Sequence, residues 1–268
     1  MTRRRLDVEL VRRNLVSSRV EAQRAIDAGL VRIGGISTPK PSTLVSPDDP
    51  VHLEGTPEPF VSRGGRKLDG ALTAWNLDVE GLRAVDVGAS TGGFTDCLLQ
   101  RGVDHVVAVD VGYGQIHNRL RSDPRVTVIE RTNIRTADTE ALGAPFDLIV
   151  ADLSFISLRY LVDVFDRLGT HEARWILLIK PQFEAGRESV GRGGVIRDAD
   201  VRRSTVEGVI ESFAGHGLGC QRLDVSSITG ANGNVEFVAM FTRAERSVDD
   251  DAIAAVTTAT TTEEGATT

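Results

Sequence analysis

Apolar and polar residues follow two different patterns along the 268-residue chain, and the change comes near residue 60. Before that point, residues 6–15 and 17–29 carry apolar side chains at helical spacing. Short apolar runs of strand length follow at residues 30–35 and 50–55. Residues 1–60 are therefore predicted to form a small α+β domain with two helices followed by a hairpin-like β segment.

From residue 61 to residue 246 apolar runs of strand length alternate with helical stretches. The predicted strands are residues 83–88, 105–110, 126–130, 147–153, 175–180, 221–228 and 235–243. Alternating strands and helices favour an α/β domain with a Rossmann-like, mainly parallel sheet that has helices on both faces. Residues 247–268 are mostly Thr, Ala, Asp and Glu, and we expect them to form a disordered acidic tail.

Composition narrows the class of protein. The chain is 41% hydrophobic and 26% charged, which is ordinary for a globular protein. No window approaches the roughly 18 unbroken apolar residues of a membrane helix, and no apolar stretch follows the N-terminal arginines as in a secretory signal. Two cysteines are too few for a disulfide framework or a cysteine-rich zinc site. We therefore expect a cytoplasmic monomer without a bound metal.

Charge is unevenly distributed along the chain. The formal net charge is -7, yet residues 1–47 hold nine Lys and Arg against four Asp and Glu. A basic end on an acidic chain predicts a docking surface for a polyanion. Two arginine-bearing helices followed by a β segment resemble the S4-like RNA-binding fold. That resemblance implies RNA contacts by Arg3, Arg4, Arg5, Arg19 and Lys40.

Residues 84–96, "AVDVGASTGGFTD", have the pattern of a strand, a glycine-rich turn and a helix start. The spacing matches neither the phosphate-binding GxxxxGK[ST] motif nor GxGxxG. Asp110 ends the next predicted strand, where a carboxylate can accept hydrogen bonds from both hydroxyls of a ribose. Asp86 is expected beneath the turn. Together these features resemble the cofactor half of S-adenosylmethionine-dependent methyltransferases.

Lysine is rare in this chain: of 31 Lys and Arg residues only Lys40, Lys67 and Lys180 are lysines. Lys180 ends the apolar run "WILLIK". A buried lysine can lose its proton, whereas arginine cannot, so Lys180 is a candidate base. The alternative is a structural lysine whose ammonium reaches water from the strand end.

Three further polar residues are predicted at ends of elements, where the sites of parallel sheets gather. Asp152 ends the predicted strand before Lys180, Lys67 precedes the first helix of the second domain, and Glu236 begins the last strand. The order lysine, aspartate, lysine, glutamate resembles the tetrad of FtsJ/RrmJ-type RNA ribose 2′-O-methyltransferases.

Six motifs extend the resemblance over residues 3–243: "VSRGGRKL", "DVGASTGGFTD", "DVGYGQ", "DLSFISL", "IKPQFE" and "GNVEF". They resemble the TlyA family, also called haemolysin A, whose members methylate cytidine ribose in ribosomal RNA of the small subunit and, in some members, the large subunit. The resemblance implies a catalytic tetrad of Lys67, Asp152, Lys180 and Glu236. It implies that S-adenosylmethionine is bound by Asp86, Gly88, Ala89, Ser90, Thr91, Gly92, Gly93, Phe94, Asp110, Asn133 and Asp152.

Chemistry suggests how the tetrad divides its work. A ribose 2′-hydroxyl must lose its proton as it attacks, which favours Lys180 as general base. Asp152 is expected to orient Lys180 and to favour a cationic cofactor, while Lys67 and Glu236 hold the ribose. Asp152 and Glu236 oppose the loss of a proton from a lysine and burial promotes it, and the residue pattern leaves that balance open.

Three other functions fit parts of the sequence. A base methyltransferase usually needs a cysteine nucleophile or an Asn/Asp-Pro-Pro-aromatic turn, and here the corresponding turn reads "DLSF". A membrane-active haemolysin needs a spanning or strongly amphipathic element, for which there is no convincing candidate. A non-catalytic RNA-binding assembly factor would have no need of all four tetrad residues.

Overall fold

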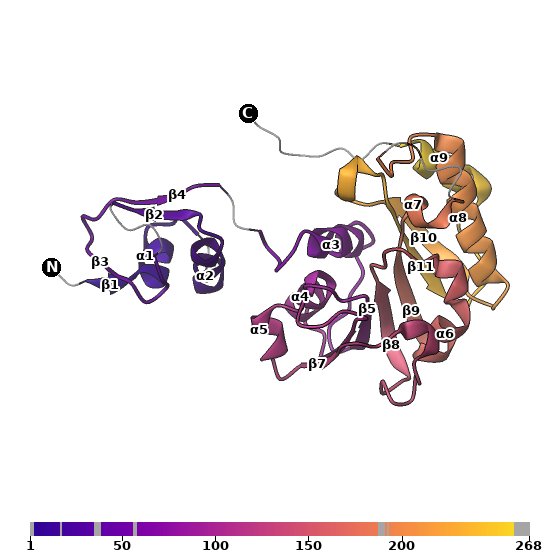
Figure 1. Cartoon of the computed structure of the whole chain (residues 1–268), viewed down its shortest axis with the longest axis horizontal. Helices are drawn as coiled ribbons and strands as arrows, with labels where there is room; N and C mark the ends of the chain where they lie inside the picture. The colour runs from indigo at the N-terminus through magenta and orange to yellow at the C-terminus, as the bar shows by residue number, and fades with distance from the viewer. Residues whose placement is uncertain are drawn as a thin grey trace. The chain divides into compact units, whose positions relative to one another are not determined.

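The computed structural model of the protein describes residues 3–16, 18–34, 39–55, 58–186, 191 and 193–259. The chain divides into two compact units, residues 1–59 and residues 60–268 (Figure 1). Each unit has hydrophobic core residues of its own.

The N-terminal unit contains the predicted helices and β segment. Its elements are β1 (Arg4–Arg5), α1 (Leu6–Arg12), α2 (Arg19–Asp27), β2 (Val31–Ile33), β3 (Leu44–Val45) and β4 (Val51–Leu53). Strand β2 pairs antiparallel with β4, and β1 pairs antiparallel with β3 in a short ladder that the pattern did not predict. Leu6, Leu10 and Ile26 pack in the core between the helices and the strands. Ser18 Oγ caps α2 by accepting a hydrogen bond of 3.2 Å from the Glu21 amide.

The second unit contains one seven-stranded sheet, and all seven predicted strands belong to it. The strands are β5 (Arg83–Val87), β6 (His105–Val109), β7 (Val126–Ile129), β8 (Phe146–Ala151), β9 (Gly169–Ile179), β10 (Gly219–Val225) and β11 (Phe237–Thr242). Their order is β10-β11-β9-β8-β5-β6-β7. The pairs among β9, β8, β5, β6 and β7 are parallel, whereas β11 runs antiparallel to both of its neighbours. The predicted Rossmann-like class is confirmed.

Helices cover both faces of the sheet (Figure 1). They are α3 (Gly64–Ala74), α4 (Gly93–Gln100), α5 (Asn118–Arg121), α6 (Val162–Leu168), α7 (Pro181–Glu184), α8 (Ala199–Ala214) and α9 (Asp250–Thr258). Successive residues of β8 face opposite sides of the sheet: Leu148 and Val150 join the core with α3 and α4, while Ile149 and Ala151 join the core with α6 and α8. Burial on both faces explains why the strands read as continuous apolar runs.

The topology brings chemically active residues to one edge of the sheet. Asp110, Asp152 and Lys180 directly follow β6, β8 and β9, and parallel strands end on the same edge. Glu236 directly precedes β11, which runs in the opposite direction, and Phe237 pairs with Ile179 at the end of β9. The start of β11 therefore lies at the edge where β9 ends.

The expected disordered tail is wrong for residues 250–258, which form α9. The Asp249 side chain caps the helix by accepting a hydrogen bond of 2.8 Å from the Ala252 amide. Ile253 and Thr257, one helical turn apart, are fully buried, and α9 packs against α8 and β10. Two apolar residues at helical spacing, Ile253 and Val256, suffice to dock a short helix in a Thr-rich and Ala-rich stretch. Residues 260–268 of the predicted tail lie outside the described residues.

If α9 is part of the core, Ile253→Ala should lower the free energy of unfolding of the α/β unit by about 2–4 kcal/mol, because the substitution leaves a cavity. Denaturation followed by the fluorescence of Trp75 and Trp175, which both belong to this unit, measures the effect. The exposed control Ala255→Ser should stay within about 0.5 kcal/mol of the wild type. Equal stability of both variants would show that α9 is not docked.

Candidate active site

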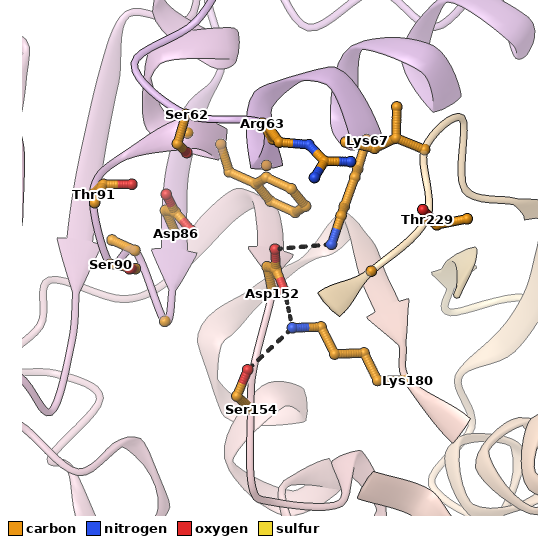
Figure 2. Close-up of a pocket in the computed structure, with 17 residues that line it drawn as sticks. Ser62, Arg63, Lys67, Asp86, Ser90, Thr91, Asp152, Ser154, Lys180 and Thr229 are labelled. Atoms are coloured by element: carbon orange, nitrogen blue, oxygen red, sulfur yellow. Dashed lines mark hydrogen bonds and ion pairs between the residues drawn. The ribbon is translucent and has the colours of Figure 1, made fainter. Parts of the chain in front are cut away.

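Two adjoining cavities lie at the carboxyl edge of the parallel strands. The first has a volume of about 340 Å³ and the second about 480 Å³, and both are lined by Gly88, Ser90, Asp152 and Ser154. Figure 2 shows Asp152 in the first cavity between the side chains of Lys67 and Lys180. The glycine-rich turn forms one wall of this cavity and residues 228–230 belong to another. Together the cavities make one cleft, large enough for a nucleoside-sized cofactor.

The glycine-rich turn is held close to the strand that carries Asp152. Gly88 has φ +83°, and a Cβ atom there would lie 2.8 Å from the Leu153 side chain and 3.1 Å from the Asp152 carbonyl oxygen. Only glycine fits this position without strain. The same turn leads into α4, whose first residue, Gly93, lies against the start of α3. The turn therefore offers backbone, with little side chain, to whatever fills the cleft.

Asp86 lies beneath the turn and is fully buried. Its Oδ2 accepts hydrogen bonds from the Thr95 amide at 2.9 Å and the Thr95 hydroxyl at 2.6 Å. Within the described residues its Oδ1 has no hydrogen-bond partner, and Asp86 lines the first cavity. Burial raises the pKa of Asp86 to about 7, against the opposing effect of Thr95. A cationic ligand in the cleft would therefore supply the hydrogen-bond partner that this carboxyl oxygen lacks within the described residues.

Asp110 and Asn133 line the second cavity. Asp110 Oδ2 accepts a hydrogen bond of 2.7 Å from the Ser90 amide, and Oδ1 accepts one of 2.7 Å from the Gly112 amide. These bonds fix the orientation of the carboxylate, and each oxygen keeps a second lone pair for a ligand hydroxyl. Asn133 follows β7, and its Oδ1 accepts a hydrogen bond of 3.1 Å from the Arg135 amide.

The four tetrad residues form a chain of charge contacts. Lys180 Nζ lies 2.5 Å from Asp152 Oδ1, and Lys67 Nζ lies 3.8 Å from Asp152 Oδ2. Lys67 Nζ also lies 2.6 Å from Glu236 Oε2. Lys67, Lys180 and Glu236 are buried, and Asp152 is partly buried. Two ammonium groups and two carboxylates alternate, which compensates the cost of burying each charge.

Other side chains set the positions of this chain. Lys180 Nζ donates to Ser154 Oγ at 3.2 Å, and Gln182 Nε2 donates to Glu236 Oε1 at 3.2 Å. Gly230 passes so close to the Glu236 carboxylate that a Cβ atom would overlap it. Glu236 therefore contacts groups from α3, α7 and the loop before β11.

A buried glutamate joins the loop after β8 to α7. Glu184 accepts hydrogen bonds from the Ser157 hydroxyl at 2.5 Å and the Leu158 amide at 2.8 Å. Arg159 donates to the Glu184 carbonyl oxygen at 2.8 Å. Burial raises the pKa of Glu184. Asp152 precedes this loop and Lys180 precedes α7. The contacts of Glu184 therefore limit the movement of Asp152 relative to Lys180.

Most of the residues predicted from the sequence meet in this cleft. The two cavities are lined by Lys67, Asp86, Gly88, Ala89, Ser90, Thr91, Gly93, Phe94, Asp110, Asn133, Asp152 and Lys180. Glu236 joins them through Lys67. Gly92 is outside the lining: it has φ +94° and packs against Leu120. The predicted place of Lys67 before the helix is wrong, because Gly64 and Gly65 open α3 and Lys67 lies in its first turn.

Several lining residues were missed by sequence reasoning. Ser154 follows Asp152 by two positions, so its proximity could have been inferred from the "DLSF" turn. Ser62 and Arg63 stand in the "VSRGGRKL" motif beside Lys67. Thr229 and Gly230 reach the cleft from the loop before β11, and nothing in their local pattern indicates it.

The predicted RNA-binding residues belong to the N-terminal unit. Arg5 and Arg19 come from different elements and meet at Asp7, whose Oδ2 lies 3.1 Å from Arg5 Nη2 and 2.8 Å from Arg19 Nη2. Arg3, Arg4 and Lys40 are exposed. The Pro41 carbonyl oxygen, next to Lys40, accepts a hydrogen bond from the Asp7 amide. Lys40, Arg5 and Arg19 therefore lie around the start of α1.

Comparison with known proteins gives matches over both units. Residues 60–243 match the FtsJ-like methyltransferase family, and residues 4–51 match the S4 domain. The chain is 47% identical to the 16S/23S rRNA (cytidine-2'-O)-methyltransferase TlyA of Mycobacterium tuberculosis, over 88% of each chain. It is 36% identical to Hemolysin A of Brachyspira hyodysenteriae, over 88% of this chain and 99% of the relative. A solved structure from Streptococcus thermophilus, described as a hemolysin, has 35% identity and a TM-score of 0.73, with 96% of this chain and 95% of that chain covered.

The buried Asp86 predicts a dependence of stability on pH. Its pKa is about 7 in the folded protein and near 3.8 in the unfolded chain, so the folded state stays protonated up to a higher pH. Raising the pH from about 4.5 to 8 therefore lowers the free energy of unfolding of the wild type. Because Asp86→Asn removes the titrating group, its free energy of unfolding relative to that of the wild type should rise by about 3 kcal/mol over that range. Denaturation followed by tryptophan fluorescence at each pH measures the free energy of unfolding. The exposed control Asp104→Asn should show no such gain, and a parallel pH profile for Asp86→Asn and wild type would contradict the buried, protonated carboxyl.

Proposed function

Because this chain belongs to the FtsJ-like methyltransferase family and to its TlyA-like branch, we propose that it methylates cytidine ribose 2′-hydroxyls in ribosomal RNA with S-adenosylmethionine. The observation that carries the proposal is the Asp152 carboxylate, which contacts Lys67 and Lys180 beside the glycine-rich turn. The N-terminal unit matches the S4 domain and would hold the RNA. We assign the protein to the cytoplasm, acting as a monomer on ribosomal subunits.

The cleft fits S-adenosylmethionine, a cation with an α-ammonium group, a ribose and an adenine. Asp86 offers a buried oxygen that has no partner among the described residues for the ammonium group, and Asp110 offers both of its oxygens for the ribose hydroxyls. Gly88 leaves room for close approach of the ligand to the backbone. Asn133 and Ile134 line the second cavity, where the adenine would lie. When bound, this cofactor supplies an electrophilic methyl group.

In this proposal Lys180 takes the proton of the attacking hydroxyl. Its amine faces the cleft next to Asp152, and Ser154 holds it from the other side. Lys180 Nζ would accept the proton that the ribose 2′-hydroxyl loses as its oxygen attacks. Asp152 carries the negative charge that favours a cationic cofactor beside the amine.

In this proposal Lys67 and Glu236 hold the target ribose. They form a buried ion pair in which Lys67 Nζ lies 2.6 Å from Glu236 Oε2. Gln182 donates a hydrogen bond to the other carboxylate oxygen of Glu236. A fixed pair of one donor and one acceptor can orient a ribose through its hydroxyls. Such placement matters because an in-line methyl transfer depends on the direction of approach of the oxygen.

An exposed aromatic side chain stands beside the cleft. Phe155 lines the second cavity, the residue is 91% exposed, and its φ of +66° is unusual for a bulky residue. The Phe155 ring lies 5.0 Å from the Phe183 ring, centroid to centroid. Unpaired bases in RNA stack on exposed aromatic side chains. Phe155 is therefore the surface on which the base of the target cytidine stacks.

Relatives support ribosomal RNA as the substrate. The relative from Mycobacterium tuberculosis is named for both 16S and 23S ribosomal RNA, which favours the small subunit as substrate with the large subunit as a second. The name Hemolysin A raises the alternative of membrane activity. No helix within the described residues is long and apolar enough to cross a membrane. Nothing in the geometry of the site favours that alternative.

Lys180→Arg keeps the positive charge but removes the amine that can accept a proton. We expect methyl transfer to fall by about 10²–10⁴-fold or more, with cofactor affinity within a few-fold of wild type. The assay is mass spectrometry of 2′-O-methylcytidine in ribosomal subunits from cells that lack this gene, incubated with protein and cofactor. The matched surface control, Arg167→Lys, should leave transfer unchanged. Turnover of Lys180→Arg at the wild-type rate would exclude Lys180 as the base.

Phe155→Ala should raise the KM for ribosomal subunits by roughly 10-fold, because stacking of one base on an aromatic ring contributes about 1–3 kcal/mol. Phe155→Trp should retain near-normal KM, since any flat ring can serve. Tyr160, an exposed aromatic residue outside both cavities, provides the control Tyr160→Ala. If Phe155→Ala and Tyr160→Ala have the same KM, base stacking on Phe155 is ruled out.

A further inference from the structure

Two carboxylates of α1 are buried in the N-terminal unit beneath arginine side chains. Asp7 is 2% exposed and Glu9 is fully buried. Arg5 and Arg19 bind Asp7, and we call these three residues the Asp7 cluster. Arg4, Arg12 and Arg13 surround Glu9, at distances of 4.0, 2.6 and 2.8 Å, and form the Glu9 cluster with it. In each cluster the arginines outnumber the carboxylate, so a net positive charge remains.

The two carboxylates bind their arginines as bidentate partners. Arg5 donates from Nε at 3.0 Å and from Nη2 at 3.1 Å to the two oxygens of Asp7. Arg12 donates from Nε at 2.9 Å and from Nη2 at 2.6 Å to the two oxygens of Glu9. Hydrogen bonds from Arg5 lower the pKa of Asp7 to about 2, and those from Arg12 do the same for Glu9. Both acids are therefore charged at any working pH.

This geometry leaves part of each guanidinium for another partner. A guanidinium has five N–H donors, and the side-on contact through Nε and Nη2 leaves the Nη1 edge pointing away from the carboxylate. The side chains of Arg5, Arg12 and Arg19 are 49%, 47% and 62% exposed. Arg13 differs: it is 20% exposed and also donates to the carbonyl oxygens of Ser46, Pro47 and Asp49. Arg13 therefore braces the fold, while the other three present donors to solvent.

We propose that Asp7 and Glu9 are positioning residues for RNA, which hold Arg5, Arg12 and Arg19 in the orientation that receives backbone phosphates. The inference rests on the proposed RNA-binding function of this unit. A free arginine loses rotamer freedom when it binds a phosphate, and an arginine already fixed by a buried carboxylate loses less. The carboxylates themselves lie beneath the guanidinium groups, so these shield RNA phosphates from their charge.

This assignment makes an unusual prediction. Removing an acidic residue from a nucleic-acid-binding unit normally strengthens binding, because the net positive charge rises. Here Asp7→Asn and Glu9→Gln should each weaken binding of the full-length protein to unmodified ribosomal subunits by about 5-fold at fixed salt. The control Asp27→Asn removes one negative charge from an exposed residue of the same unit, and Asp27 pairs with no arginine in the part of the chain that the structure describes. It should bind as tightly as wild type, or more tightly.

A double-mutant cycle separates positioning from loss of fold. In the background Arg5→Gln/Arg19→Gln, the added Asp7→Asn should change the affinity for subunits by less than about 2-fold, since Asp7 acts through those arginines. A variant that merely unfolds the unit would lower affinity in both backgrounds. Equal or tighter binding by Asp7→Asn and Glu9→Gln would overturn the inference while wild type still binds and methylates. Failure of wild-type protein to bind any ribosomal subunit would instead overturn the proposed function.

Discussion

The Asp152 carboxylate, between the ammonium groups of Lys67 and Lys180, is the interaction on which the site depends. Burying either lysine alone would be costly, and a carboxylate shared between them, with Glu236 as the fourth charge, compensates that cost. The sheet provides the arrangement: β8 and β9 are parallel neighbours, so Asp152 and Lys180 leave the same edge. The antiparallel strand β11 then brings Glu236 to this edge.

Buried carboxylates organise cations in both units, but the cations differ. In the N-terminal unit Asp7 and Glu9 hold arginines, which keep their charge permanently and suit phosphate contacts. In the α/β unit Asp152 holds lysines, and a lysine can give up its proton. The scarcity of lysine, three among 31 Lys and Arg residues, fits this division, because two of the three stand in the cleft.

The sequence pattern predicted the strands well because burial on both faces makes them continuous apolar runs. It also placed Asp110, Asp152 and Lys180 at strand ends, and parallel pairing then brings them together. Helix α9 was missed because its core contacts depend on only two or three side chains. The pair between Lys67 and Glu236 joins residues 169 positions apart, and Thr229 reaches the cleft from a loop, so neither had a local signal.

The most direct test of the central claim is a crystal structure of the protein with sinefungin, a cofactor analogue that carries an amine where the transferred methyl group stands. The measured quantity is the position of that amine relative to Asp152 and Lys180. We expect the amine to face the Asp152 carboxylate, with room for one ribose hydroxyl between it and Lys180 Nζ. An amine directed away from both lysines, with the analogue bound elsewhere than between Asp86 and Asp110, would contradict the proposed site.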